Sequence, residues 1–213
     1  IPGVKDPSDS KELKVVDASD DEFRLLPIEE IFSRYPGLRS QEEHVLEESL
    51  NDLFIACYSE GSQLMEIEPY LSHLMAQGTV NVRRAALTAW ANLVDNRVKP
   101  QHLQTLYAVA NIPGLDQATF DQVIVAACKF AEEGAYQLVQ QLAQAGDPHI
   151  RREVASGLRF HSAEKFNGKR ELLIALTQDA DPQVRAAAIG GFTSYRDDQQ
   201  IMHGVANQAD RDP

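Results

Sequence analysis

Six histidines and two cysteines are the side chains of this sequence best suited to metal binding or covalent chemistry. His44 and Glu48 stand four positions apart, so a helix would place both on one face, in position to share a metal ion. Two ligands do not complete a site, because a structural zinc ion takes four. We therefore interpret the pair as part of a solvated helix surface and predict no metal site.

Cys57 and Cys128 are the two cysteines, and both fall on apolar positions of helical patterns. A free cysteine at such a position behaves as a small hydrophobic residue. We expect two buried, inert thiols. A disulfide or a reactive thiol is the alternative.

Motifs for catalysis or nucleotide binding are missing from the sequence. Gly168-Lys169-Arg170 is similar to the end of a phosphate-binding loop, but Ala163 holds the position of the upstream glycine. No C-x-x-C, H-E-x-x-H or G-x-S-x-G occurs. We therefore predict no catalytic residue and no cofactor.

The chain is acidic, with a net charge of −12, and the acidity is concentrated at the start: residues 1–60 hold 15 acidic and 6 basic side chains. An acidic protein repels phosphate backbones, which makes nucleic acid an unfavourable partner. No apolar run approaches 18 residues, so the sequence predicts a soluble protein without a membrane span.

Turn residues and charge divide the chain into three parts. Residues 1–24 carry Pro2, Gly3 and Pro7 near their start and the acidic cluster Asp17–Glu22 near their end, which predicts a tail or linker. Residues 25–61 predict two helices that cap the fold. Residues 62–213 show helical periodicity throughout and no period-2 alternation, which predicts an all-α chain.

The two capping helices have clear boundaries in the sequence. Pro27 opens a short helical pattern that ends at Tyr35, before a Pro-Gly pair. Ser40 and Glu43 then match a capping box, in which each side chain accepts a hydrogen bond from the other's backbone N–H. We expect the second helix to run from this box to about Tyr58.

A repeated segment organises residues 62–213. Its spacings of 38, 30 and 34 residues lie in the range of helical-hairpin repeats. The four copies are Val82–Leu87, Phe120–Val125, Ile150–Ala155 and Val184–Ile189. Each copy is followed by a small residue and then an apolar one: Ala89-Trp90, Ala127-Cys128, Gly157-Leu158 and Gly191-Phe192. Because glycine costs a helix about 1 kcal/mol relative to alanine, its recurrence predicts that a neighbouring helix passes close by.

Turn residues support the same repeat. Asp147-Pro148 and Asp181-Pro182 each place an N-cap acid before a proline in the first helical turn. The string from Asp179 to Arg185 resembles the loop and second helix of HEAT repeats, in particular the short bacterial type also found in phycobilin lyase subunits. This resemblance covers about residues 62–213. It implies an α-solenoid of antiparallel helix pairs, a HEAT-like superhelix.

The resemblance also implies roles for the residues of the repeat. In the family, an aspartate six residues before the arginine builds a hydrogen-bond ladder between repeats. Here that aspartate occurs once, as Asp179 before Arg185, while Gln77 precedes Arg83 and Ala145 precedes Arg151. The second copy has Asp121 in place of the arginine. We expect an interrupted ladder, with stacking that depends more on apolar packing.

The resemblance places the second helix of each pair on the concave side of the superhelix. Residues one, five and eight positions after the arginine share a face by helical geometry. They form a polar to basic stripe: Arg84, Thr88, Gln122, Lys129, Arg152, Ser156, Arg159 and Thr193. We interpret the stripe either as a solvated surface or as a groove for an acidic peptide or protein segment.

Three functions are compatible with the sequence. The first is a non-enzymatic scaffold or adaptor that binds a protein through its concave face. The second, from the repeat subtype alone, is a lyase- or isomerase-type subunit that acts on a protein-bound bilin. The third is an accessory domain of a larger enzyme.

The C-terminal residues predict an incomplete last repeat. Asp210–Pro213 reproduce the turn of Asp179–Pro182, and the expected partner helix does not follow. We expect an apolar edge near Ile201 and Val205 that promotes self-association. The acidic cluster Asp17–Glu22 either keeps its segment soluble or folds back onto the basic stripe.

Overall fold

A computed structural model describes residues 24–130, 132–159 and 168–192. Within these ranges the chain forms ten α-helices and no β-strand. The helices are α1 (Ile28–Arg34), α2 (Glu43–Glu60), α3 (Glu68–Gln77), α4 (Val80–Val94), α5 (Pro100–Ala110), α6 (Gln117–Lys129), α7 (Glu133–Leu142), α8 (Pro148–Leu158), α9 (Lys169–Leu176) and α10 (Pro182–Gly191). Thr193 and the predicted C-terminal edge at Ile201 and Val205 lie outside the described residues.

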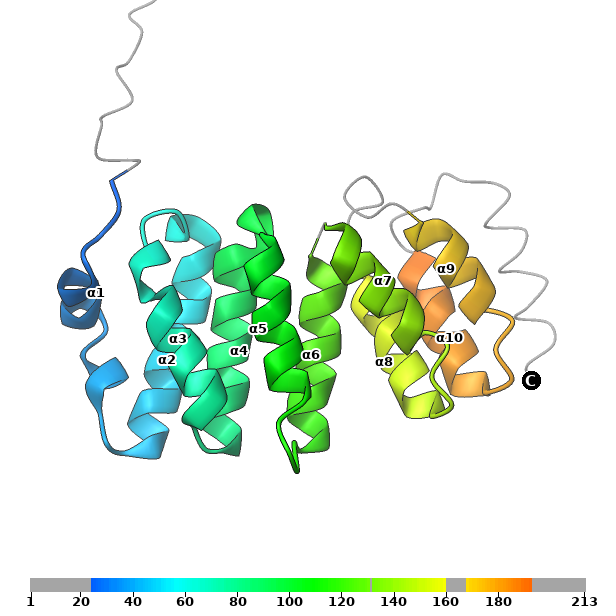
Figure 1. The fold of residues 1–213 in the computed structure, drawn as a ribbon, viewed down its shortest axis with the longest axis horizontal. Coiled ribbons are helices and arrows are strands. Elements are labelled where there is room, and N and C mark those ends of the chain that lie inside the picture. Colours follow the sequence, from blue (N-terminus) through cyan, green and yellow to red (C-terminus); the bar gives the residue numbers. More distant parts are fainter. Residues whose placement is uncertain (1–23, 131, 160–167, 193–213) are drawn as a thin grey trace, which may run out of the picture.

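The helices form two layers of an α-solenoid (Figure 1). One layer is built by α2, α4, α6, α8 and α10, each packed against the next. The other holds α3, α5, α7 and α9, which stand in front of the first layer in Figure 1. The chain crosses between layers at every turn, so the pairs are antiparallel, as the repeat predicts. We call the side of the first layer turned away from α3, α5, α7 and α9 the second-helix face.

Two helices of the first layer, α8 and α10, begin with the predicted turn chemistry. The Asp147 carboxylate accepts the backbone N–H of His149 at 2.8 Å, and Asp181 accepts those of Gln183 and Val184 at 2.8 and 3.3 Å. Each cap satisfies backbone N–H groups that have no partner within the helix. These two N-caps confirm the interpretation of the Asp-Pro pairs.

The predicted capping box at Ser40 and Glu43 is wrong. A 3₁₀ helix, η2 (Pro36–Arg39), ends at Ser40, and the Ser40 hydroxyl accepts the N–H of Glu42 at 3.0 Å instead of that of Glu43. The α-helix therefore begins later, at Glu43. Ser40 is therefore the C-cap of η2, and the N-cap of α2 is Glu42.

Small residues allow close packing between the repeats, as predicted. Ala89, Ala127, Gly157 and Gly191 are all buried. A Cβ atom on Gly157 would lie 2.9 Å from the Sγ atom of Cys128 in α6, closer than real side chains approach. Trp90 is fully buried and makes edge contacts with Phe130 and His102, which confirms its place in the core.

Both thiols are free and buried, as expected from their apolar positions. Burial disfavours the charged thiolate and raises the pKa of Cys57 to about 12. Burial likewise raises the pKa of the Cys128 thiol.

No helix within the described ranges is both long and apolar enough to cross a membrane.

The arginines of the repeat share one contact. Arg83, Arg151 and Arg185 each donate to backbone carbonyls at the end of the first helix of their own pair or in the turn that follows it, as at Ala145 and Gly146 for Arg151 (2.7 and 3.1 Å). Carbonyls at a helix C-terminus and in the turn after it have no partner within the helix, and the guanidinium supplies the missing donors. The contact uses main-chain atoms, so it does not require an aspartate at the preceding turn.

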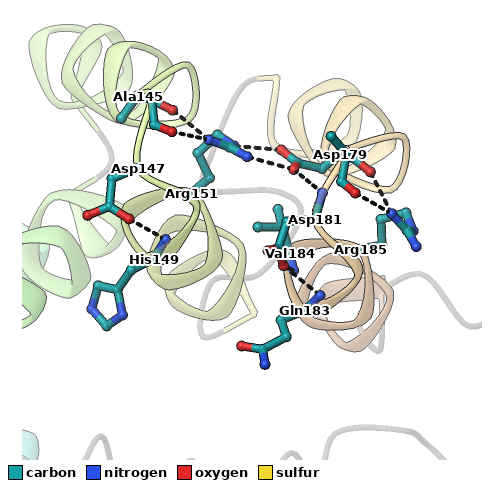
Figure 2. Close-up of polar contacts among 11 residues, drawn as sticks. Ala145, Asp147, His149, Arg151, Asp179, Asp181, Gln183, Val184 and Arg185 are labelled. Carbon is teal, nitrogen blue, oxygen red and sulfur yellow. Dashed lines mark hydrogen bonds and ion pairs between the residues drawn. The ribbon is translucent and has the colours of Figure 1, made fainter.

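The Asp179 side chain bonds between repeats, as the family's ladder implies, but its partner is Arg151 and not Arg185 of its own repeat. Its carboxylate accepts from Arg151 of the preceding repeat at 2.7 and 2.8 Å, whereas Arg185 donates to the Asp179 main-chain carbonyl at 2.9 Å (Figure 2). Asp179 therefore links two repeats through its side chain and caps its own repeat through its backbone.

Candidate binding surface on the second-helix face

A groove crosses α2, α4 and α6 on the second-helix face. It encloses about 360 Å³, which is at the small end of ligand-binding sites. Its lining residues are Phe54, Tyr58, Leu87, Thr88, Ala91, Asn92, Asp95, Gln122, Val125, Ala126 and Lys129. None of them belongs to α3 or α5, so the groove opens away from the other layer. We call it the α2–α6 groove.

The groove has an apolar floor because small and branched side chains meet there. Ala91 of α4 and Val125 and Ala126 of α6 leave space that Phe54 and Tyr58 of α2 bound on one side. The two aromatic rings pack edge to face, with centroids 5.3 Å apart. Tyr58 is 71% exposed although it is a large side chain. The floor and this exposed ring form an apolar surface at one side of the groove.

Polar side chains join α4 to α6 across the groove. The Thr88 hydroxyl donates to the main-chain carbonyl of Arg84 at 2.9 Å and lies 3.4 Å from Gln122 Oε1, and the Lys129 ammonium donates to Asn92 Oδ1. Asn92 in turn donates to the main-chain carbonyl of Thr88 at 3.3 Å. These bonds hold Thr88, Asn92 and Lys129 in fixed positions along the groove.

Lys129 carries the groove's positive charge at a partly buried position. Burial lowers the pKa of its ammonium, and the nearby carboxylate of Asp95 opposes this shift. Three N–H donors belong to an ammonium, and the contact with Asn92 uses one of them. An acceptor on a bound segment can therefore bond to Lys129 without displacing Asn92.

A second polar cluster lies farther along the same face, across α6, α8 and α10. His149 Nε2 is 2.9 Å from Asp121 Oδ1, and Arg152 donates to His149 Nδ1 at 3.0 Å. Arg152 also donates to Gln183 of α10 at 3.1 Å and to Glu153 at 3.0 Å. Asp121, which replaces the repeat arginine, thus forms a link to the next repeat. The cluster borders a small cavity of about 170 Å³.

The structure brings together part of the predicted stripe. Thr88, Gln122 and Lys129 line the α2–α6 groove, whereas Arg152 belongs to the second cluster. Arg84 lies one helical turn before Thr88 and donates to Asn81 at 3.3 Å. Ser156 is half-buried on α8, Arg159 is exposed at its C-terminal end, and Thr193 lies outside the described residues.

The sequence interpretation missed the contribution of α2 and the apolar floor. Phe54 and Tyr58 belong to a helix that was assigned only a capping role, and their exposure depends on how α2 packs against α4. The sequence does contain a signal for Asn92 and Asp95. They follow Thr88 by four and seven residues, so helical geometry places them on the same helix face as Thr88.

Metal-binding side chains do not gather in the part of the chain that the structure describes: no group of three or more histidines, cysteines or carboxylates is close enough to hold an ion. His44 is exposed on α2, and its Nε2 atom lies 3.7 Å from Glu42 rather than against Glu48.

Comparison with known proteins gives structural neighbours alone. No protein-family model matches the sequence, and no curated protein matches it. An engineered protein of known crystal structure matches over 85% of both chains, with 15% identity and a TM-score of 0.45. A computationally designed armadillo repeat protein for modular peptide recognition matches over 85% of this chain and 91% of its own, with 14% identity and a TM-score of 0.43. The helical-repeat architecture follows from the helices and contacts of the chain itself.

Proposed function

We propose that this protein is a HEAT-like helical-repeat module that binds a segment of a partner protein on its second-helix face. The observation that supports the proposal is the α2–α6 groove, in which an apolar floor and an exposed tyrosine adjoin fixed amide and ammonium groups. Interfaces of this kind combine an aromatic or aliphatic anchor with polar groups that set orientation.

The groove chemistry suits an extended acidic segment with an apolar anchor. The anchor occupies the floor beside Tyr58 and Ala91, and the main chain of the segment bonds to Thr88 and Gln122. Its carboxylates lie toward Lys129 and Arg84. The alternative of a lyase- or isomerase-type subunit that acts on a protein-bound bilin rests on the repeat subtype alone.

A selection from a displayed peptide library tests the proposal. We expect the selected peptides to be rich in Asp and Glu around one Phe, Trp or Leu. Tyr58→Ala should weaken their binding about tenfold or more, because exposed aromatic anchors contribute about 2 kcal/mol or more at interfaces. Tyr107→Ala is the matched control, since Tyr107 is also exposed but lies on α5 in the other layer. Equal losses in the two variants, or basic consensus peptides, would contradict the proposal.

A further inference from the structure

We propose that the α2–α6 groove has an occupant within this chain, the acidic segment of residues 13–23. The inference rests on the proposed function, because it takes the groove to be a binding surface. It goes further in naming the segment that fills the groove when no partner does.

The first described residues lie at the end of the molecule that contains the α2–α6 groove. Leu26 is buried, and its backbone N–H donates to the Gln63 carbonyl at 2.8 Å, which fixes it just after the end of α2. Tyr58, Asp95 and Lys129 lie at the C-terminal ends of α2, α4 and their neighbour α6. These helix ends and the start of the described chain lie along the upper edge of the molecule in Figure 1.

The distance to be covered is short for a segment of this length. Packed helices are 8–10 Å apart, so α2 and α6 are separated by about 20 Å. An extended chain spans about 3.3 Å per residue, and ten residues therefore reach about 33 Å. Residues 13–23 can lie across the groove while Leu26 stays in its observed position.

The chemistry of the segment matches that of the groove. Its sequence, Leu13 to Phe23, contains four carboxylates at Asp17, Asp20, Asp21 and Glu22 and one lysine. Leu13, Val15, Val16 and Phe23 are apolar residues that the floor can accept. Among the described residues, the groove lining holds one cation, Lys129, and one carboxylate, Asp95, and a second carboxylate beside the Lys129 ammonium further offsets the desolvation of that partly buried charge.

Because the segment and the groove belong to the same chain, even a weak intrinsic affinity is enough to keep the groove occupied. A segment joined by a short linker has an effective concentration in the millimolar range. An intrinsic dissociation constant of about 100 μM then leaves the groove filled in about nine molecules of ten, and a competing partner binds about tenfold more weakly.

A nitroxide on Ser19→Cys in the full chain tests the occupant directly. The two native cysteines are buried, so the label attaches to the new thiol. We expect the label to broaden the methyl signals of Leu87 and Val125, which line the groove, and to leave those of Ile174 on α9 unchanged. Neutralising the segment in the same labelled chain, by Asp17→Asn, Asp20→Asn, Asp21→Asn and Glu22→Gln, should abolish the broadening.

A second measurement uses a fluorescent synthetic peptide of residues 11–24. It should bind the neutralised full-length variant about tenfold more tightly than the unmodified chain, and Lys129→Met in the neutralised variant should weaken that binding. Absence of broadening at Leu87 and Val125, or equal broadening at Ile174, would overturn the proposal. If library peptides still bind through Tyr58 in that case, the proposed function stands and the in-chain occupant fails. If neither library peptides nor this peptide binds, both fail.

Discussion

Arg151 and Asp179 form a bidentate ion pair that ties α8 to the turn before α10, with N–O distances of 2.7 and 2.8 Å. Both side chains are mostly buried, at 15% and 9% exposure. The remaining Arg151 nitrogen donates to Ala145 and Gly146 in the turn before α8 (Figure 2). One guanidinium therefore connects the α7–α8 turn to the α9–α10 turn of the next repeat.

Asp179→Asn should destabilise the fold by about 1 to 2 kcal/mol. The change keeps an acceptor for the Asp181 N–H but removes the charge that faces Arg151, and charge-assisted bonds of this kind contribute about that amount. Denaturant unfolding monitored by circular dichroism measures the difference. Asp181→Asn is the matched control, because asparagine caps a helix about as well as aspartate. An equal loss in both variants would show that the ion pair adds nothing.

The ion pair between Arg151 and Asp179 makes the stability of the fold depend on pH. The hydrogen bond from Arg151 lowers the pKa of Asp179 below its ordinary value. A carboxylate with a lowered folded-state pKa contributes stability above its unfolded pKa of about 4, and this contribution is lost as the pH falls toward the folded value. We expect the stability difference between the wild type and Asp179→Asn to shrink below pH 4, with unfolding free energies measured at intervals from pH 6 to pH 3. A constant difference would contradict the assignment.

His102 should cause a second loss of stability, in a higher pH range. Its Nδ1 atom accepts the Lys99 N–H at 3.0 Å, so the folded state requires a neutral ring. Burial lowers the pKa of His102, and Lys99 adds to this effect, while Glu68, 3.2 Å from Nε2, opposes it. The unfolded chain therefore binds a proton first as the pH falls through about 6.5, and stability decreases by at most about 1.4 kcal/mol per pH unit.

His102→Gln separates this titration from the other groups. Glutamine at the third helical position can bond the N-cap N–H but does not titrate. Between pH 7.5 and 5.5 the variant should therefore show a flatter stability profile than the wild type. Parallel profiles would mean that another group is responsible.

Two glycines of the repeat should respond to alanine in opposite directions. Gly157→Ala should destabilise by about 1 to 3 kcal/mol, because its new Cβ would overlap Cys128 and core overpacking has costs of that size. A Cβ atom on Gly190 would meet none of the described residues within 4 Å, so Gly190→Ala should stabilise by up to about 1 kcal/mol through helix propensity. Cys128→Ala combined with Gly157→Ala should recover part of the loss. Thermal unfolding of the four proteins distinguishes packing from propensity, and a stabilised Gly157→Ala would refute the packing argument.

The spacing of apolar and small residues predicted the helical-repeat architecture well, because it indicates which helix faces are buried. The small residues at Gly157 and Gly191, and the apolar residues beside them, required a close neighbouring helix, and the structure has one. The partner of Asp179 was beyond the reach of such patterns. The spacing within one repeat suggests Arg185, but the offset between stacked repeats decides that the carboxylate meets Arg151.

For the candidate site, the sequence could predict which residues share a face of a single helix. Helical geometry placed Gln122 and Lys129 on one face of their helix, and the resemblance placed Thr88 of the preceding repeat on the same side. The structure joins the three residues in one groove. Tyr58 could not be found in this way, because its helix precedes the first recognisable repeat. Its role follows from the packing of α2 against α4, which is a tertiary contact without a local sequence signal.

Neither of the two thiols should react with a disulfide reagent while the protein is folded. Thiolate is the reactive form, and burial raises the pKa of Cys57 to about 12 and that of Cys128 as well. Reaction at pH 7.5 therefore requires an opening of the structure. Cys57 is 7% exposed on α2, whereas Cys128 is fully covered between α6 and α8, so Cys57 should react first. Absorbance kinetics with the wild type and Cys57→Ala assign the two phases. Two thiols that react together, at the rate of a small-molecule thiol, would show that neither helix shields its cysteine.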